Sequence, residues 1–490
     1  MLLTRSTWIV LSSLALGAAA CGLDSTADSA GDGFGGGDGF GATPGGVKDM
    51  ELARELLDNG QIPPPGAILV EGMFSEHDLG LAGEPCKRTL CLRAAAGIAP
   101  DAEGTPAGWV QLGLSSTVDP ETWARPSTTF VMTVDVSGSM GWEYQDGEYP
   151  SAGQLSRELL RGLAEELTRR DRVAIVTYGD DVGEPLRLTA GDDPAFDAVV
   201  EGLSTDGSTN MEAGLVRAYR IAREAIQDGE TDEVRILLFT DVQPNVGLTE
   251  ASDFERMVSD GADDGIGITV LAVGLGIGPE VLASMAHLRG GNAFSFFRQS
   301  DVEAFMAEDW PWFTSPIAHD LSLEVTPRAD LQVGEKYGFP GGEQPGLEVS
   351  SVFLSRRKGA LLFSLEGDDL SAMGADIALS YIDADGERVN EQLTAAHGGE
   401  PLDERGHHFD QEATARATSL ALLVSGMRRA AELYAESPDQ AETIMSRTDE
   451  RFAADAAAIA DPTLDVELEM SARMLALISE RAEQGTLYGQ

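Results

Sequence analysis

Residues 130–140 read FVMTVDVSGSM, an apolar run that ends in a cluster of oxygen-bearing side chains. The run is too short for a helix and rich in residues that favour strands, so we predict a buried β-strand. After Asp135, hydroxyls follow at Ser137 and Ser139, alternate positions that share one face of an extended chain. Gly138 lets the backbone turn there. Three side-chain oxygens therefore converge at the carboxyl end of the strand, where open α/β sheets bind ligands.

Two distant segments offer similar oxygens at the ends of predicted elements. Residues 207–210, Gly-Ser-Thr-Asn, open an amphipathic helix, and the apolar strand at 236–239 is followed by a threonine and an aspartate. Strand and helix patterns alternate through this region, which predicts a parallel sheet covered on both faces. Right-handed crossovers would then place Asp135, Thr209 and Asp241 together on one rim.

These motifs resemble the von Willebrand factor A (VWA) family, whose metal-ion-dependent adhesion site uses this five-residue pattern. The resemblance implies that Ser137, Ser139 and Thr209 bind the metal directly, whereas Asp135 and Asp241 hold it mainly through water. It is specific over about residues 128–297. The order of the segments resembles bacterial VWA proteins akin to inter-alpha-trypsin inhibitor heavy chains and calcium-activated chloride channel-like proteins.

The chemistry of this site favours a hard divalent cation. Mg²⁺ prefers near-octahedral oxygen ligands and is usually held by one or two carboxylates plus waters. Neutral hydroxyls in the inner shell leave the ion able to accept a carboxylate from a partner protein as its sixth ligand. We therefore expect Mg²⁺, or Mn²⁺ or Ca²⁺, and a protein partner. Val242 stands where the family often has glycine, which affects the shape of the loop more than coordination.

Two other functions stay open beside metal-dependent binding. A serine hydrolase would use Ser139 or Ser137, but residues 138–141 do not match Gly-x-Ser-x-Gly, since Ser137 occupies the place of the first glycine. A structural scaffold with an inactive metal site is the other alternative. Our interpretation is a binding protein rather than an enzyme, because the histidines that could act as a base lie outside the strand-end motifs: His77, His287, His319, His397, His407 and His408.

The chain is strongly acidic. Its 490 residues include 34 Lys and Arg against 82 Asp and Glu, a formal net charge of −48. This charge argues against binding nucleic acid or anionic lipid electrostatically. The length allows two to four domains.

The amino terminus has the pattern of a bacterial secretory signal. Within residues 1–20, Arg5 precedes an apolar core at 8–16 and small residues at 17–20. Because Cys21 follows directly, the segment resembles a lipoprotein signal in which this cysteine is lipidated; a plain secretory signal is the alternative. We expect a protein of the bacterial cell envelope, lipid-anchored at the outer membrane or periplasmic face, or otherwise secreted.

Lipidation of Cys21 would leave two cysteines, Cys86 and Cys91. In an exported chain, such a close pair predicts a local disulfide. Residues 22–46 are rich in Gly, Asp, Ser and Ala, and we interpret them as a flexible tether.

The expected fold class is α/β, a doubly wound, mostly parallel, Rossmann-like sheet of the VWA type. It is joined to a β-rich amino-terminal segment, with strands at residues 67–70 and 109–114, a β-sandwich-like domain and a helical carboxyl-terminal tail. We predict these segments: signal peptide 1–20, lipidated cysteine and tether 21–48, β-rich segment 49–118, VWA domain 119–312, β-sandwich-like domain 313–400 and helical region 401–490.

Overall fold

The computed structural model describes residues 40–119, 121–142, 149–241, 251–274, 278–310, 312–340 and 347–488. The predicted signal, Cys21 and most of the predicted tether lie outside these ranges. From residue 38 onward the chain forms one compact unit.

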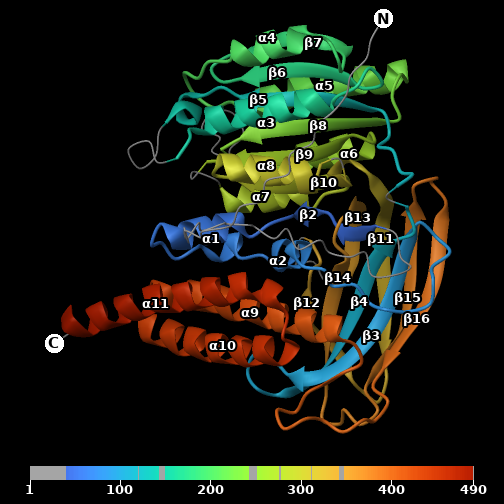
Figure 1. The fold of residues 1–490 in the computed structure, drawn as a ribbon, viewed down its shortest axis with the longest axis vertical. Coiled ribbons are helices and arrows are strands. Elements are labelled where there is room, and N and C mark those ends of the chain that lie inside the picture. The colour runs from blue at the N-terminus through green and yellow to red at the C-terminus, as the bar shows by residue number, and fades with distance from the viewer. Residues whose placement is uncertain are drawn as a thin grey trace, which may run out of the picture. The chain divides into compact units, whose positions relative to one another are not determined.

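The expected parallel sheet is present, with seven strands in the order β2-β10-β9-β8-β5-β6-β7 (Figure 1). The central strand β5 lies between β6 and β8 and is parallel to both, whereas β7 runs antiparallel at one edge. All residues of β5 are buried, as expected for a strand covered on both faces. The strands are β2 (Gly46–Val47), β5 (Thr128–Asp135), β6 (Arg172–Tyr178), β7 (Val182–Ala190), β8 (Glu233–Thr240), β9 (Gly267–Val273) and β10 (Gly291–Phe296).

Helices cover both faces of this sheet, so the predicted doubly wound class is confirmed. Val131 faces a core built with α5, α6 and α7, while its neighbours Phe130 and Met132 face a core built with α3, α4 and α8. A capping box between Ser151 and Gln154 begins α3. The helices are α3 (Ala152–Glu166), α4 (Ala195–Glu201), α5 (Met211–Asp228), α6 (Ala251–Asp263), α7 (Pro279–Ala286) and α8 (Gln299–Glu308).

A second, ten-stranded sheet runs β12-β14-β4-β1-β13-β11-β15-β16, with β3 pairing to β4 and β17 pairing to β3. Side chains of β3, β4 and β14 share one core with side chains of β11, β13 and β15, so the strands form two facing layers. The strands are β1 (Gly41–Pro44), β3 (Leu90–Pro100), β4 (Pro106–Ser116), β11 (Pro316–Pro327), β12 (Gln332–Tyr337), β13 (Glu348–Ser355), β14 (Gly359–Glu366), β15 (Gly374–Asp383), β16 (Arg388–Ala396) and β17 (His408–Phe409).

The amino-terminal segment differs from the prediction in two ways. The strand predicted at residues 67–70 is instead the end of a short helix, η1 (Pro65–Ala67), and the start of α2 (Val70–Glu76). The proline at the first position of η1 favours helical backbone there. In addition, the strands β3 and β4 belong to the ten-stranded sheet, in which β4 pairs with β14. This pairing was not predicted because local sequence does not specify a partner so far along the chain.

The predicted tether is wrong for residues 40–48, which are buried or nearly buried. Within seven residues β1 pairs with β13 of one sheet and β2 pairs with β10 of the other. The glycines here serve close packing: a Cβ on Gly41 would lie 1.9 Å from the carbonyl oxygen of Arg357, and one on Gly45 would lie 2.6 Å from that of Gly291.

The buried Arg235 also joins the two sheets. It projects from β8 and donates hydrogen bonds to the Gly290 oxygen at 2.9 Å and to Thr269 Oγ1 at 3.1 Å. Its guanidinium carbon lies 5.4 Å from the ring centroid of Phe353, on β13. Burial lowers the pKa of Arg235 to about 10, so the side chain remains charged at neutral pH. Hydrogen bonds and ring contact together compensate for burying this charge.

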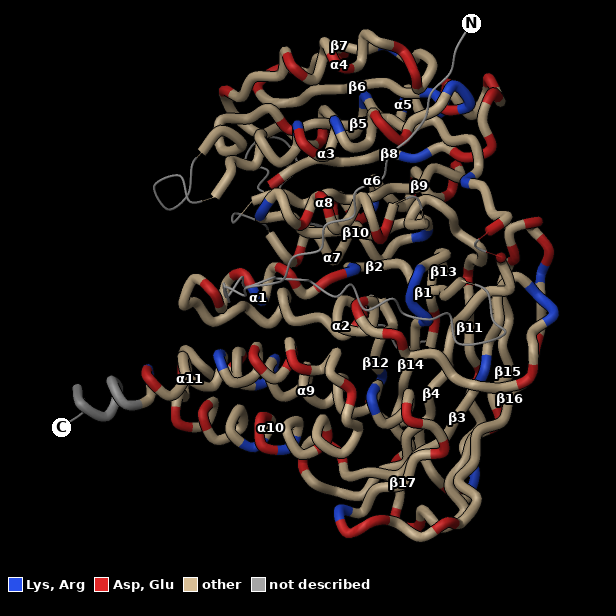
Figure 2. The backbone as a smooth tube through the Cα atoms, in the orientation of Figure 1, with Lys and Arg blue, Asp and Glu red and all other residues tan. Residues whose placement is uncertain are grey.

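Three long helices follow, as predicted: α9 (Glu412–Tyr434), α10 (Pro438–Ile459) and α11 (Asp465–Tyr488). They share a core with α1 (Glu51–Asp58), α2 and the buried Trp109 of β4. Acidic residues outnumber basic ones on α10 and α11 (Figure 2). Among the described residues, no helix combines the length and the apolar character that crossing a bilayer requires.

Gly41→Ala is expected to lower the free energy of unfolding by about 1–3 kcal/mol, because the added methyl group has no room against the Arg357 backbone. Gly202→Ala is the matched control, since its Cβ would meet Ala198 at an ordinary 3.4 Å. Thermal denaturation of both variants measures the difference. Equal midpoints would contradict close packing of β1.

Candidate metal site at the sheet edge

The site is built around Asp135, the last residue of the central strand β5. Its side chain is 1% exposed. Oδ1 accepts the N–H of Ser137 at 2.9 Å, which folds the following loop back over the strand end. Oδ2 accepts the hydroxyl of Thr240 at 3.2 Å, which ties β5 to the end of the neighbouring strand β8.

Ser137 and Ser139 lie in the turn that follows, around the short helix η2 (Gly138–Gly141). Their Oγ atoms are 3.1 Å apart. Adjacent vertices of an octahedron with metal–oxygen distances of 2.0–2.1 Å are separated by about 3 Å. The two hydroxyls are therefore spaced as neighbouring ligands of one small divalent ion.

Backbone hydrogen bonds bring the loop of Thr209 to this turn. Gly138 N donates to the Gly207 oxygen at 3.0 Å, and Asp206 N donates to the Val136 oxygen at 2.8 Å. Gly207 has a φ of +81°, a backbone conformation that favours glycine. Thr209 follows two residues later and is buried.

Asp241 directly follows Thr240 and is also buried. Burial is the main reason that the pKa of Asp135 rises to about 6; the hydrogen bonds from Ser137 oppose this rise, and the Asp241 carboxylate adds to it. Ionised Asp135 is therefore destabilising at neutral pH unless a positive charge compensates it.

The structure thus brings the three predicted segments to one edge of the sheet. Asp135, Ser137 and Ser139 are linked by direct hydrogen bonds, whereas Thr209 and Asp241 are positioned through their neighbours. Buried carboxylates at the ends of β5 and β8, with hydroxyls at octahedral spacing, fit a divalent cation with oxygen ligands.

Two residues that support the site were not predicted. Thr240 bridges two strand ends, although its sequence context suggests no role beyond preceding Asp241. Asp180 lies just after β6 and accepts hydrogen bonds from both the N–H and the hydroxyl of Ser208, which shapes the loop before Thr209. Its position after a strand of the same sheet was the available signal.

The hydrolase alternative requires a base near Ser137 or Ser139. Ser137 and Ser139 hydrogen-bond to each other, and no histidine is among their hydrogen-bond partners in this part of the chain. Cys86 and Cys91 form a disulfide at the start of β3, a strand of the ten-stranded sheet, with Cα atoms 5.6 Å apart.

Comparison with known proteins identifies the fold. A family described as von Willebrand factor type A domain matches residues 130–243. YfbK, an uncharacterized protein of Escherichia coli, is 28% identical over 283 residues, which cover 56% of this chain and 47% of that protein. Pig inter-alpha-trypsin inhibitor heavy chain H4 is 25% identical over 234 residues, 46% of this chain and 24% of that one.

The chain thus spans about half the length of the first relative and about a quarter of the second. Among solved structures, a von Willebrand factor type A protein from Catenulispora acidiphila superposes with a TM-score of 0.51 at 14% identity, over 77% of this chain and 89% of that one. This likeness shows the fold. The chain therefore contains a von Willebrand factor type A domain.

Proposed function

We propose that this chain binds a partner protein through a divalent metal ion held at the carboxyl edge of the VWA sheet. VWA domains commonly mediate protein–protein interactions and often bind a divalent metal ion. The observation that carries the proposal is the burial of Asp135 beside the Asp241 carboxylate, next to two hydroxyls 3.1 Å apart. An ion at this point would offset the charge that burial makes unfavourable.

The hydroxyls of Ser137, Ser139 and Thr209 would bind the ion directly, and Asp135 and Asp241 would hold it mainly through water. Mg²⁺ suits this oxygen set, with Mn²⁺ or Ca²⁺ as alternatives. The bound ion supplies a Lewis-acidic point that attracts a carboxylate of the partner. Ser139 is half-buried, so the ion would be reachable from the surface of the loop.

The charge of the chain constrains the partner. A net charge of −48 repels acidic proteins at long range, and only at short range would the ion attract a carboxylate. We therefore propose a partner surface that is basic around a single exposed Glu or Asp. Binding of such a surface would weaken with salt.

We also propose that the protein is exported and lipid-anchored in the bacterial envelope, at the outer membrane or periplasmic face. The signal pattern of residues 1–20 followed by Cys21 supports this. The Cys86–Cys91 disulfide supports an oxidising compartment.

Mg²⁺ at about a hundred times its Kd should stabilise the wild-type fold by about 2.7 kcal/mol, seen as a higher melting temperature. Asp135→Asn should abolish this response. The variant should fold normally without metal. The raised pKa of about 6 indicates that the ionised Asp135 carboxylate is unfavourable in the fold at neutral pH, and asparagine carries no charge.

Asp181→Asn is the control for this measurement, since Asp181 is an exposed aspartate that follows β6 at the same edge of the sheet. It should retain the full Mg²⁺ response. A response that persists in Asp135→Asn, or one that is absent from the wild type, would contradict the proposed site.

The affinity for Mg²⁺ should fall in acid. Protons and metal compete for Asp135, so below its pKa of about 6 the affinity should drop by about tenfold per pH unit. Titration calorimetry at about pH 5 and about pH 7.5 measures this. Equal affinities at the two pH values would exclude the Asp135 carboxylate from binding.

Cys21→Ser should move the protein from the membrane fraction to the soluble fraction of the producing bacterium, because the acceptor of the lipid is lost. Cys86→Ser is the control: it removes the disulfide, keeps Cys21 and should stay in the membrane fraction. Fractionation with immunoblotting distinguishes the two. An unchanged distribution of Cys21→Ser would rule out this anchor.

A further inference from the structure

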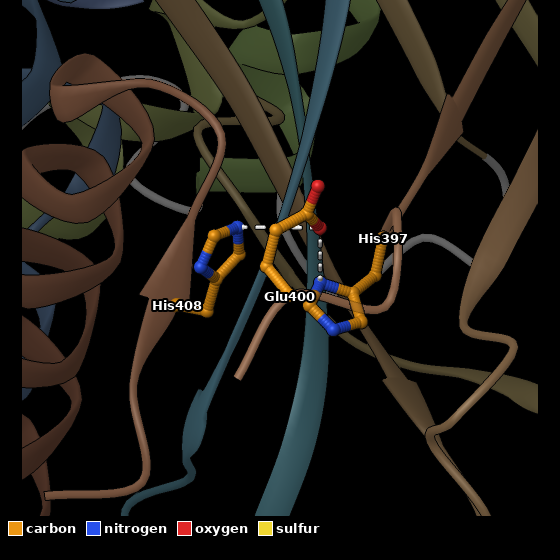
Figure 3. Close-up of side chains that lie close together, drawn as sticks. All are labelled: His397, Glu400 and His408. Carbon is orange, nitrogen blue, oxygen red and sulfur yellow. Dashed lines mark ion pairs between the residues drawn. The ribbon is translucent and has the colours of Figure 1, made fainter. Parts of the chain in front are cut away.

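A second group of metal-ligating side chains lies outside the VWA domain, between β16 and β17. His397, Glu400 and His408 point toward one another (Figure 3). Glu400 Oε2 lies 3.8 Å from His397 Nδ1 and 3.8 Å from His408 Nε2. One ligand atom from each residue lies within 4.8 Å of the other two.

Both histidines are held by regular structure. His397 directly follows β16, and its N–H donates to the Met373 oxygen at 2.9 Å. His408 lies in β17 and pairs with Ile98 of β3. The two imidazole centroids are 4.9 Å apart. These positions are set by the sheet, so the two nitrogen ligands are preorganised.

His397 Nδ1 is a buried polar atom that needs a partner. Its side chain is 5% exposed, and within the described part of the chain Nδ1 makes no hydrogen bond. The Glu400 carboxylate, at 3.8 Å, is too distant for a hydrogen bond. Buried polar atoms rarely stay unsatisfied, and a metal ion between imidazole and carboxylate would satisfy this one.

The spacing suits a metal ion if the distances between the ligand atoms shorten slightly. In tetrahedral zinc sites with ligand distances of about 2.0–2.2 Å, neighbouring ligand atoms are about 3.3–3.6 Å apart. The Glu400 side chain is 52% exposed, so it can move closer to both histidines and shorten its two 3.8 Å distances.

Gly398 leaves room for the carboxylate. A Cβ on Gly398 would lie 2.6 Å from Glu400 Oε1, so glycine at this position lets the Glu400 side chain fold back toward the histidines. Gly399 has a φ of +86°, which turns the chain between them. A second carboxylate is near: Asp410 Oδ1 lies 3.6 Å from His408 Nε2, and Asp410 Oδ2 accepts the N–H of Ala96 at 3.2 Å.

We propose that His397, Glu400 and His408 bind a Zn²⁺ ion that cross-links the end of β16 to β17. Two imidazoles select a borderline-soft transition metal over Mg²⁺ or Ca²⁺, which prefer oxygen ligands. The chain would then carry two cation sites of different chemistry, an oxygen site on the VWA sheet and this nitrogen-rich site. The two are chemically independent, so failure of one leaves the other standing.

Zinc binding is measured on the full chain, carrying Asp135→Asn and stripped of metal, by calorimetric titration with ZnCl₂. We expect one Zn²⁺ per chain and a rise in melting temperature. Glu400→Gln should weaken binding about tenfold or more, since even outer-shell partners of a metal contribute about 10–100-fold. His397→Ala and His408→Ala should abolish binding.

His287→Ala is the matched control. Its side chain is 23% exposed, against 22% for His408, and it lies beside Glu255. It should bind zinc as tightly as its parent. Because Glu400 is exposed, Glu400→Gln should leave the fold intact and tests the site even if a histidine variant fails to fold. The proposal is overturned if Zn²⁺ does not bind, or if it binds equally well to Glu400→Gln and its parent.

Discussion

The candidate site at the carboxyl edge of the VWA sheet depends on one constraint. Two carboxylates are buried there, at the ends of adjacent parallel strands. Because β5 and β8 pair in parallel, the residues that end them, Asp135 and Thr240-Asp241, must lie side by side. Two like charges that are buried next to each other are unfavourable unless a positive charge compensates them. The N–H of Ser137 and the hydroxyl of Thr240 donate hydrogen bonds to Asp135, and the Gly207 oxygen accepts one from Gly138 N. These hydrogen bonds join the ends of β5 and β8 and the loop of Gly207 at one edge of the sheet.

Much of the VWA fold could be predicted because its signals are local. Short apolar runs predicted β5 and β8, an amphipathic pattern predicted α5, and a helical region was predicted where α9, α10 and α11 lie. Pairing between distant segments could not be predicted, since nothing near Leu112 indicates that it lies opposite Leu361. The glycine-rich composition also led to the wrong prediction of a tether at Gly41. Glycine is frequent in flexible tethers, but it also occurs where backbones pack too closely for a side chain, as at Gly41.

The two candidate sites differ in how visible they are in the sequence. Asp135, Ser137 and Ser139 follow a strand in a fixed pattern, so a family resemblance located them. His397, Glu400 and His408 match no such pattern: the ligands converge only because β17 pairs with β3 and because the chain turns at two glycines. Their geometry depends on tertiary structure, so no sequence motif groups these histidines.

The segment from Gly41 to Val47, shared by two sheets, has a mechanical consequence. A pulling force applied to the chain ahead of Phe40 enters the fold at β1, and β2 follows two residues after β1 ends. To extract this segment, the force must break its pairing with β13 and then with β10. The ten-stranded sheet therefore bears the load first, and the force reaches the VWA sheet only after β1 has separated from β13.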